Sequence, residues 1–330
     1  MTAGRVLARS LPYLRRSIAG IPVRLLLFLC IGAVVTVYKM IRSLFIRHDP
    51  EDPGRSLRQE EAPQLWSLTR EVAETIGTRP IDEIRVTPGT DLAVYEKGSF
   101  TERTQDRARR TLILGVGVLN DFDQTAFRAV LAHEYGHFSH RDTAGGDVAL
   151  RVQRDIINFA TAMIVAGQAV WWNIAFLFLR VYHFIFRRIT YGASRLQEVL
   201  ADRLAVLNYG ANAFEEGLKH VIRRSVEFED VAYREITDAG NAGRSLQNLY
   251  ELKTGEEQGI EDKVSEVLNR QTALDDSHPS PAERFRLARR ITHTAEPLAG
   301  GMVWDLFTDR ESLTKEMSSL IETQAVAVEA

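Results

Sequence analysis

The chain has 330 residues, of which 45% are hydrophobic and 26% are charged, and its net charge is −3. This near-balance of charge argues against a nucleic-acid-binding protein, which usually has a basic excess or a clustered basic face. The chain has one cysteine, Cys30, so it can form no internal disulfide and no cysteine-type zinc site. Any transition metal must therefore be held by His, Asp and Glu side chains.

The N-terminal region is basic and then apolar. Residues 1–20 contain several arginines and no acidic residue, and an apolar run follows at 21–41. This run is long enough to cross a bilayer, and no small-residue cleavage pattern follows it. We therefore predict that 1–47 is a basic N-terminus with an uncleaved transmembrane anchor, with a buried core helix as the alternative. Residues 48–57 are rich in Pro, Gly and charge, which predicts a linker to a domain at 58–330.

The first part of this domain shows a helical pattern, then three strand patterns, and then a second helical pattern. Apolar residues recur at helical spacing in 58–77, and Gly77 is a suitable stop. A helix at 121–140 can be capped by Asp121 or Asp123. Three short apolar runs bounded by turn residues are predicted to be strands: 82–88, 91–98 and 109–120. We expect the last strand to be a sheet edge beside the functional site.

A second apolar segment, 156–186, lies within an insert at about 150–188. It is too long for one membrane span and short for two. We predict a turn around 167–173 that joins two apolar helical arms. The sequence after it predicts a helix at 194–210 with four leucines on one side, and then a helical, polar region at 211–330. The predicted fold class is therefore mainly α (α+β), with a small β-sheet and membrane-associated helices.

His133, Glu134 and His137 form the pattern H-E-x-x-H. Positions four apart share a helix face, so both imidazoles can point at one ion while Glu134 reaches a metal-bound water. Zinc lowers the pKa of its water toward about 7, and a neighbouring carboxylate can take the proton as the water attacks. The alternative is a solvated helix that happens to carry histidines. His140 is about one turn further along, and we expect it to be a supporting or surface group.

A catalytic zinc commonly takes two His and one Glu ligand, with one position left for water. The helix predicted after the insert supplies Glu198, and Ala201 and Ala205 on the same side would permit close approach of another helix. Asp202 is one turn beyond Glu198 and can orient a ligand histidine through its second ring nitrogen. The alternative is a solvated acidic face that is paired with neighbouring arginines.

H-E-x-x-H followed by S-R-x-x-E-x-x-A-D on a later helix resembles the M48 metallopeptidases, over roughly residues 60 to 290. The resemblance implies a zincin fold of the gluzincin type, with one Zn²⁺ per chain held by both histidines and Glu198. It also implies that His278, in the stretch SHPSPAER, stabilises the oxyanion of the reaction, with Arg284 close by. Asp142 falls where the family often has Asp or His, so we expect it to support the metal site.

The three metal ligands must meet within about 2 Å of one ion, so they lie on one side of a membrane. The insert must therefore cross twice, dip in and return, or lie on the surface. Basic residues after the first apolar segment (Lys39, Arg42 and Arg47) and on both flanks of the second favour a cytoplasmic catalytic domain under the positive-inside rule. The arginines before the first segment argue for the opposite orientation. The expected location is a bacterial-type inner or plasma membrane.

The sequence thus predicts a membrane-anchored zinc endopeptidase that acts on protein substrates, in membrane protein quality control. We expect the substrate to add as an extended strand along 112–118. The expected partners are protein or peptide substrates and the lipid membrane, with no nucleic acid, and a homo-oligomer is left open. The alternative is a non-cleaving membrane scaffold or assembly factor that keeps the zinc fold. A prenyl-protein protease would need a larger membrane chamber than two apolar segments can build.

Overall fold

The chain divides into two compact units, Met1–Glu51 and Asp52–Ala330. The structure, a computed structural model, describes residues 52–99, 101–102, 105–139, 142–167, 169–171, 173–255, 257–273, 276, 278–292 and 300–329. The predicted anchor at 21–41 and His140 lie outside the described residues.

A small sheet forms one part of the second unit. Its strands lie in the order β1-β2-β4-β3, with β2 and β4 parallel and the two outer pairs antiparallel. The strands are β1 (Arg55–Ser56), β2 (Glu83–Thr87), β3 (Leu92–Lys97) and β4 (Arg109–Gly115). All three predicted strands are confirmed. Strand β1 is an addition, because it falls within the expected linker at 48–57.

Strand β4 is an inner strand, and this corrects the expected position of the sheet edge. It pairs with β2 on one side and with β3 on the other, and Val116–Val118 form a 3₁₀ turn, η2. A substrate strand therefore cannot add along 112–118. The near-continuous apolar run of β4 is typical of a strand that is buried on both faces of its sheet. On the side of β4 away from β2, the edge strand of the described sheet is β3.

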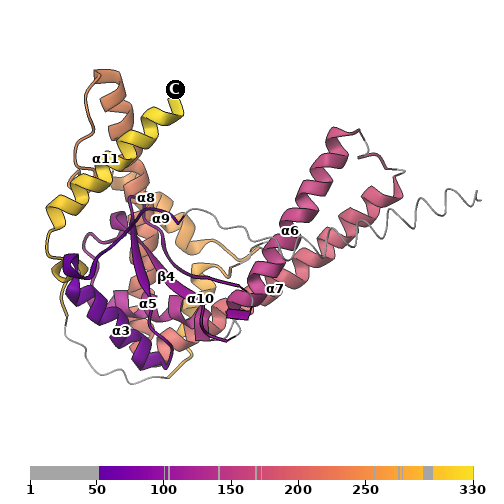
Figure 1. The fold of residues 1–330 in the computed structure, drawn as a ribbon, viewed down its shortest axis with the longest axis horizontal. Helices are drawn as coiled ribbons and strands as arrows, with labels where there is room; N and C mark the ends of the chain where they lie inside the picture. The colour runs from indigo at the N-terminus through magenta and orange to yellow at the C-terminus, as the bar shows by residue number, and fades with distance from the viewer. Residues whose placement is uncertain are drawn as a thin grey trace, which may run out of the picture. The chain divides into compact units, whose positions relative to one another are not determined.

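The two predicted helices of the core are present, but α3 (Pro63–Ile76) begins five residues after the start of the predicted segment 58–77. Helix α3 stops at Gly77, whose φ of 72° is the left-handed conformation that glycine adopts readily. Helix α5 (Gln124–Ser139) carries the H-E-x-x-H pattern. The Asp123 carboxylate accepts hydrogen bonds from the backbone N–H groups of Thr125 and Ala126, so Asp123 is the N-cap. Figure 1 shows α5 and α3 beside β4.

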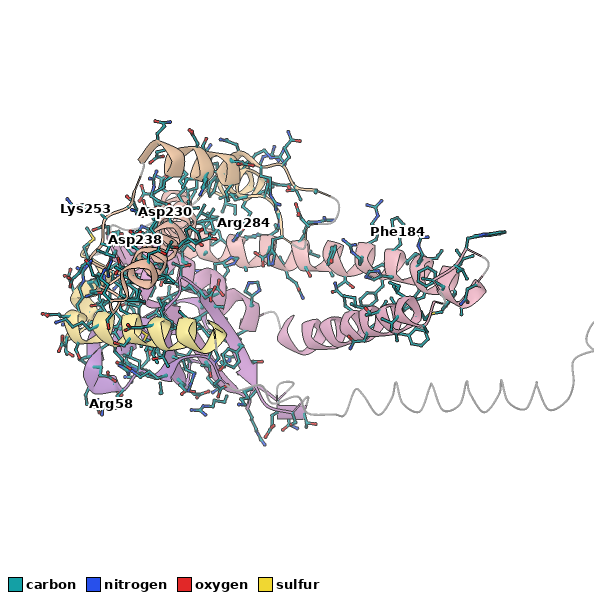
Figure 2. All side chains as sticks on the ribbon, turned by 90° about the horizontal axis from the view of Figure 1, so that it is seen from above. Arg58, Phe184, Asp230, Asp238, Lys253 and Arg284 are labelled. Atoms are coloured by element: carbon teal, nitrogen blue, oxygen red, sulfur yellow. The ribbon has the colours of Figure 1, made fainter. Side chains whose placement is uncertain are left out.

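The insert forms a helical hairpin, as predicted. Its arms are α6 (Asp142–Val165) and the first part of α7 (Ile174–Tyr209), which pack on each other. Asn173 caps α7 by accepting from the backbone N–H groups of two residues in its first turn. Figure 2 shows Phe184 on this hairpin, apart from Arg284 in the body of the unit. None of the helices in the described part of the chain combines the length and apolar content that a membrane crossing needs.

Helix α7 is longer than the predicted helix at 194–210, because the second arm of the hairpin continues into it without a break and ends at Gly210. The side that carries the leucines is not the buried side of this part of α7. Leu196 is 60% exposed and Leu207 is also exposed, whereas Ala201 and Ala205 are buried. The small residues are covered because α5 packs on this face.

The rest of the chain is helical, as predicted. A short 3₁₀ turn, η1 (Gln59–Glu61), precedes α3, and another, η3 (Val303–Leu306), precedes the last helix. The helices are α8 (Ala211–Ala242), α9 (Glu257–Asn269), α10 (Pro281–Ala288) and α11 (Arg310–Glu329). Helices α8 and α10 both pack near the two helices that carry the predicted ligands.

Candidate metal centre

Helices α5 and α7 meet at a glycine–alanine contact. A Cβ atom added at Gly136 would lie 3.0 Å from the Cα of Ala201 and 3.1 Å from its Cβ. Carbon–carbon contacts are optimal at about 3.5–4.0 Å, so the two backbones are as close as glycine allows. This close approach brings side chains near Gly136 on α5 within reach of side chains near Ala201 on α7, as the alanines of α7 predict.

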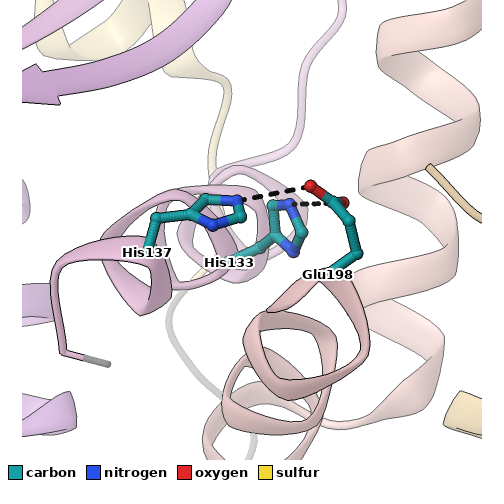
Figure 3. Close-up of side chains that lie close together, drawn as sticks. All are labelled: His133, His137 and Glu198. Atoms are coloured by element: carbon teal, nitrogen blue, oxygen red, sulfur yellow. Dashed lines mark ion pairs between the residues drawn. The ribbon is translucent and has the colours of Figure 1, made fainter. Parts of the chain in front are cut away.

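The three side chains predicted to bind metal converge across this contact, as Figure 3 shows. The Nε2 atoms of His133 and His137 each lie 3.6 Å from a carboxylate oxygen of Glu198. One ligand atom from each residue lies within 4.8 Å of the others. Two donors at 2.0–2.1 Å from a tetrahedral ion are about 3.4 Å apart, so this donor set fits a divalent metal.

A second carboxylate holds His133 from the other side of its ring. Asp202 Oδ1 lies 2.8 Å from His133 Nδ1, which directs Nε2 of the same ring toward the other ligands. Arg284 donates from Nε to Asp202 Oδ2 at 2.9 Å and from Nη2 to Asp202 Oδ1 at 2.6 Å. Glu198 and Asp202 are only 6% and 4% exposed, which excludes the solvated acidic face.

Burial and neighbouring charges set the protonation states of Glu198 and His137. Burial alone would raise the pKa of Glu198, but the hydrogen bond from His278 and the charges of His133 and Arg284 lower it to about 2. Burial, together with the neighbouring His133, lowers the pKa of His137 to about 4. At neutral pH Glu198 is therefore ionised and His137 is neutral, which are the states that bind metal.

Glu134 projects from α5 toward the end strand of the sheet. It is partly buried, and that burial raises its pKa, although His133 and a hydrogen bond from the Val94 backbone act in the opposite direction. Val94 lies in β3, so the carboxylate is next to the free side of the sheet's last described strand. A carboxylate with a raised pKa is a stronger base once it is ionised.

The residues expected from the H-P stretch also reach the centre. His278 Nδ1 lies 2.9 Å from Glu198 Oε1, and the His278 side chain is 66% exposed. Arg284 lies at the same centre from α10, whose N-cap Ser280 accepts from the backbone N–H of Glu283. Asp142 begins α6, but its side chain lies outside the described residues.

Sequence reasoning missed three residues of this region. Phe214 of α8 packs beside His133, with ring centroids 6.2 Å apart, and the Arg284 guanidinium lies 5.5 Å from the Phe214 ring centre. No local pattern marks Phe214. Gly136 could have been found, because a small residue between the histidines complements the alanines of α7. Val94 could not, because its role depends on the strand order.

Two imidazoles from one helix, a carboxylate from a second and a free carboxylate beside them make up the arrangement of a metallohydrolase. Comparison with known proteins identifies the class of reaction. The model of peptidase family M48 matches residues 107–292, more than half of the chain. The chain belongs to peptidase family M48, and it is a metallopeptidase.

The similar proteins include a curated relative and a solved structure. A protease HtpX homolog of Thermoplasma volcanium is 26% identical over 239 residues, which cover 69% of this chain and 70% of the relative. The crystal structure of S. mikatae Ste24p matches 80% of this chain with 17% identity and a TM-score of 0.38. The match covers 56% of the Ste24p chain.

Proposed function

We propose that this protein is a membrane-anchored zinc endopeptidase that hydrolyses peptide bonds in protein substrates. The observation that carries the proposal is the convergence of His133, His137 and Glu198, with Glu134 beside them. The bound metal is Zn²⁺, one per chain, since two imidazoles and one carboxylate with an open fourth position are the usual catalytic zinc set. The fold class is then a gluzincin-type zincin.

Each side chain has one part in the reaction. Zinc bound to the three ligands would acidify a water molecule and polarise the scissile carbonyl. Glu134 takes the proton from the attacking water and delivers it to the leaving amine. His278, which is exposed next to the ligands, donates to the oxyanion that forms on the substrate carbonyl.

Arg284 and Asp202 act through His133 and not on the substrate. The Arg284 guanidinium donates to both oxygens of Asp202, and its Nη2 also lies 3.3 Å from both ring nitrogens of His133, so these donors are directed at that pair. Asp202 fixes the orientation of His133 through Nδ1. We therefore assign Arg284 to positioning, in preference to the oxyanion role that the family resemblance suggests. Asp142 stays an expected supporting residue of the site.

The substrate binds as an extended strand along β3. Strand β3 has a partner on one side only in the described sheet, and its Val94 contacts Glu134. A peptide added along this side would gain backbone hydrogen bonds and present a carbonyl next to the metal ligands. This position replaces the edge at 112–118, which is occupied in the sheet.

The membrane part of the proposal rests on the hairpin and on the apolar run at 21–41. Exposed large apolar side chains cover the hairpin, and soluble proteins seldom expose so much contiguous apolar surface. They include Ile157, Phe159, Ile164, Val165, Trp171, Phe178, Val181, Phe184, Ile185 and Ile189. We propose a bacterial-type inner membrane, a catalytic unit facing the cytoplasm, and membrane-associated or misfolded proteins as substrates.

The test is proteolysis of an unfolded protein by the purified full chain in detergent. We expect cleavage that stops on chelation and returns when zinc is added, and no cleavage by Glu198→Gln. Cleavage that is unchanged by a chelator that removes all metal would overturn the proposal. Stoichiometric zinc without cleavage of any of a varied set of substrates would instead favour a scaffold or assembly factor.

A further inference from the structure

The outer surface of α7 carries a continuous apolar stripe along the hairpin. Six exposed side chains follow one another at spacings of three, one, three, four and seven residues, and no charged residue of this segment shares their side of the helix: Phe178, Val181, Tyr182, Ile185, Ile189 and Leu196. On an ideal helix they fall within an arc of about 100° and extend over about 27 Å. We name this set the apolar stripe.

A second stripe of arginines runs beside the first. Arg180, Arg187, Arg188 and Arg195 also fall within an arc of about 100°, whose centre is about 120° from that of the apolar stripe. Arg180 and Arg188 are exposed, whereas Arg195 donates to the backbone carbonyls of residues 273 and 276. The guanidinium of Arg188 lies 5.4 Å from the centre of the Phe184 ring. The remaining face of α7 packs on α6, so the helix has one internal, one apolar and one basic side.

The charge of the outer part of the hairpin, residues 156–197, is entirely positive. Residues 156–197 contain four arginines and neither a lysine nor an acidic residue. Three of the arginines, with His183 and Phe184, line a hollow of about 230 Å³. This volume is large enough for a phosphate group, and a fork of guanidinium donors is suited to bind one. The charge therefore complements an acidic lipid surface.

We infer that the hairpin lies along the surface of an acidic bilayer, with the apolar stripe of α7 among the upper acyl chains and the exposed Arg180 and Arg188 on lipid phosphates. An apolar face beside a basic face is the pattern of helices that lie in the interface plane. An upright hairpin would place Arg180 inside the hydrocarbon, which is costly. The inference rests on the proposed membrane attachment and selects one of the three topologies of the insert.

This orientation has a consequence for the metal centre. Helix α7 runs without interruption from the stripe to Glu198 and Asp202. Leu196, the last residue of the apolar stripe, is two residues before Glu198. The metal ligands therefore lie at the level of the lipid headgroups, where the enzyme meets segments that emerge from the bilayer surface.

The test uses the full chain with Cys30→Ser and single cysteines placed at each position from Val181 to Ile189. Each is labelled with a nitroxide in vesicles of phosphatidylcholine and phosphatidylglycerol. Collision with oxygen and with a neutral nickel chelate reports lipid and water contact respectively. We expect oxygen contact to peak near positions 181–182, 185 and 189, at one shallow depth of about 5–10 Å. Positions 184, 187 and 188 are expected at the headgroups.

Three results would overturn the inference. The first is a label depth that increases steadily along the arm, as it would in a membrane span. The second is contact with water at every position, and the third is spin–spin coupling that reports a second copy on the apolar stripe. We also expect Arg180→Gln and Arg188→Gln each to weaken hairpin partitioning about fivefold in acidic vesicles. The matched control, Arg203→Gln, should have no effect, and equal loss in all three variants would contradict the arginine assignment. Peptidase activity of the same proteins in detergent tests the proposed function separately.

Discussion

The contact between Gly136 and Ala201 makes a quantitative prediction about the whole site. In Gly136→Ala the new methyl carbon meets the Ala201 Cα at 3.0 Å and its Cβ at 3.1 Å. The helices must separate by about 0.3–0.5 Å to restore ordinary contact distances. Overpacking of this kind costs about 1–3 kcal/mol, while alanine gains up to about 1 kcal/mol over glycine in a helix.

Gly240→Ala is the matched control, because Gly240 lies in α8 and a Cβ there has no neighbour within 4 Å. We expect the control to be as stable as wild type or slightly more stable. We expect Gly136→Ala to be about 1–3 kcal/mol less stable than the control, measured by urea unfolding of the metal-free proteins. Zinc affinity should fall in Gly136→Ala alone, since α5 and α7 each supply ligands. Equal stability and equal affinity in the two variants would refute the close-packing argument.

Other predictions concern the residues around the ligands. Arg284→Met should destabilise the protein by about 3 kcal/mol, because it leaves the buried Asp202 carboxylate without its main counter-charge, whereas exposed Arg203→Met should stay within about 0.5 kcal/mol of wild type. The pKa of Asp202 lies below its usual value of 3.8, because the hydrogen bonds from His133 and Arg284 outweigh its burial. Its contribution to stability is thus present above pH 3.8 and lost as the pH falls through the lower folded pKa. Unfolding from pH 6 to pH 2 should show this loss in wild type and not in Asp202→Asn. His278→Gln should reduce kcat about 100-fold with unchanged zinc content, and an unchanged kcat would exclude its oxyanion role.

Local signals of the sequence were sufficient for most individual elements. The spacing of apolar residues and Gly77 predicted α3, and short apolar runs predicted β2, β3 and β4. The order of the strands was not predicted correctly, because each run shows only that a strand is covered and not which neighbour covers it. The parallel pairing of β2 and β4 joins residues that are far apart in the chain, and no local pattern specifies it.

Helix α7 shows that leucine spacing alone does not identify the buried side of a helix. Its leucines lie on one side, but the buried side includes Glu198, Asp202 and two alanines, and the prediction that the alanines permit close packing is confirmed. Burial of carboxylates is ordinarily unfavourable, and it is offset here by His133 and Arg284, which lie within hydrogen-bond distance of Asp202. Sequence could place the acidic residues at the site from spacing, but not the packing partner Phe214, which comes from a helix further along the chain.

In the proposed mechanism, Glu134 is the general base beside a metal held by His133, His137 and Glu198. The most direct measurement is the zinc content and the turnover of Glu134→Gln and wild type in parallel preparations of the full chain. We predict one zinc per chain in both proteins, and a kcat at least about 100-fold lower in the variant, because a general base typically contributes that much or more. Cleavage by the zinc-loaded variant at the wild-type rate would contradict the account.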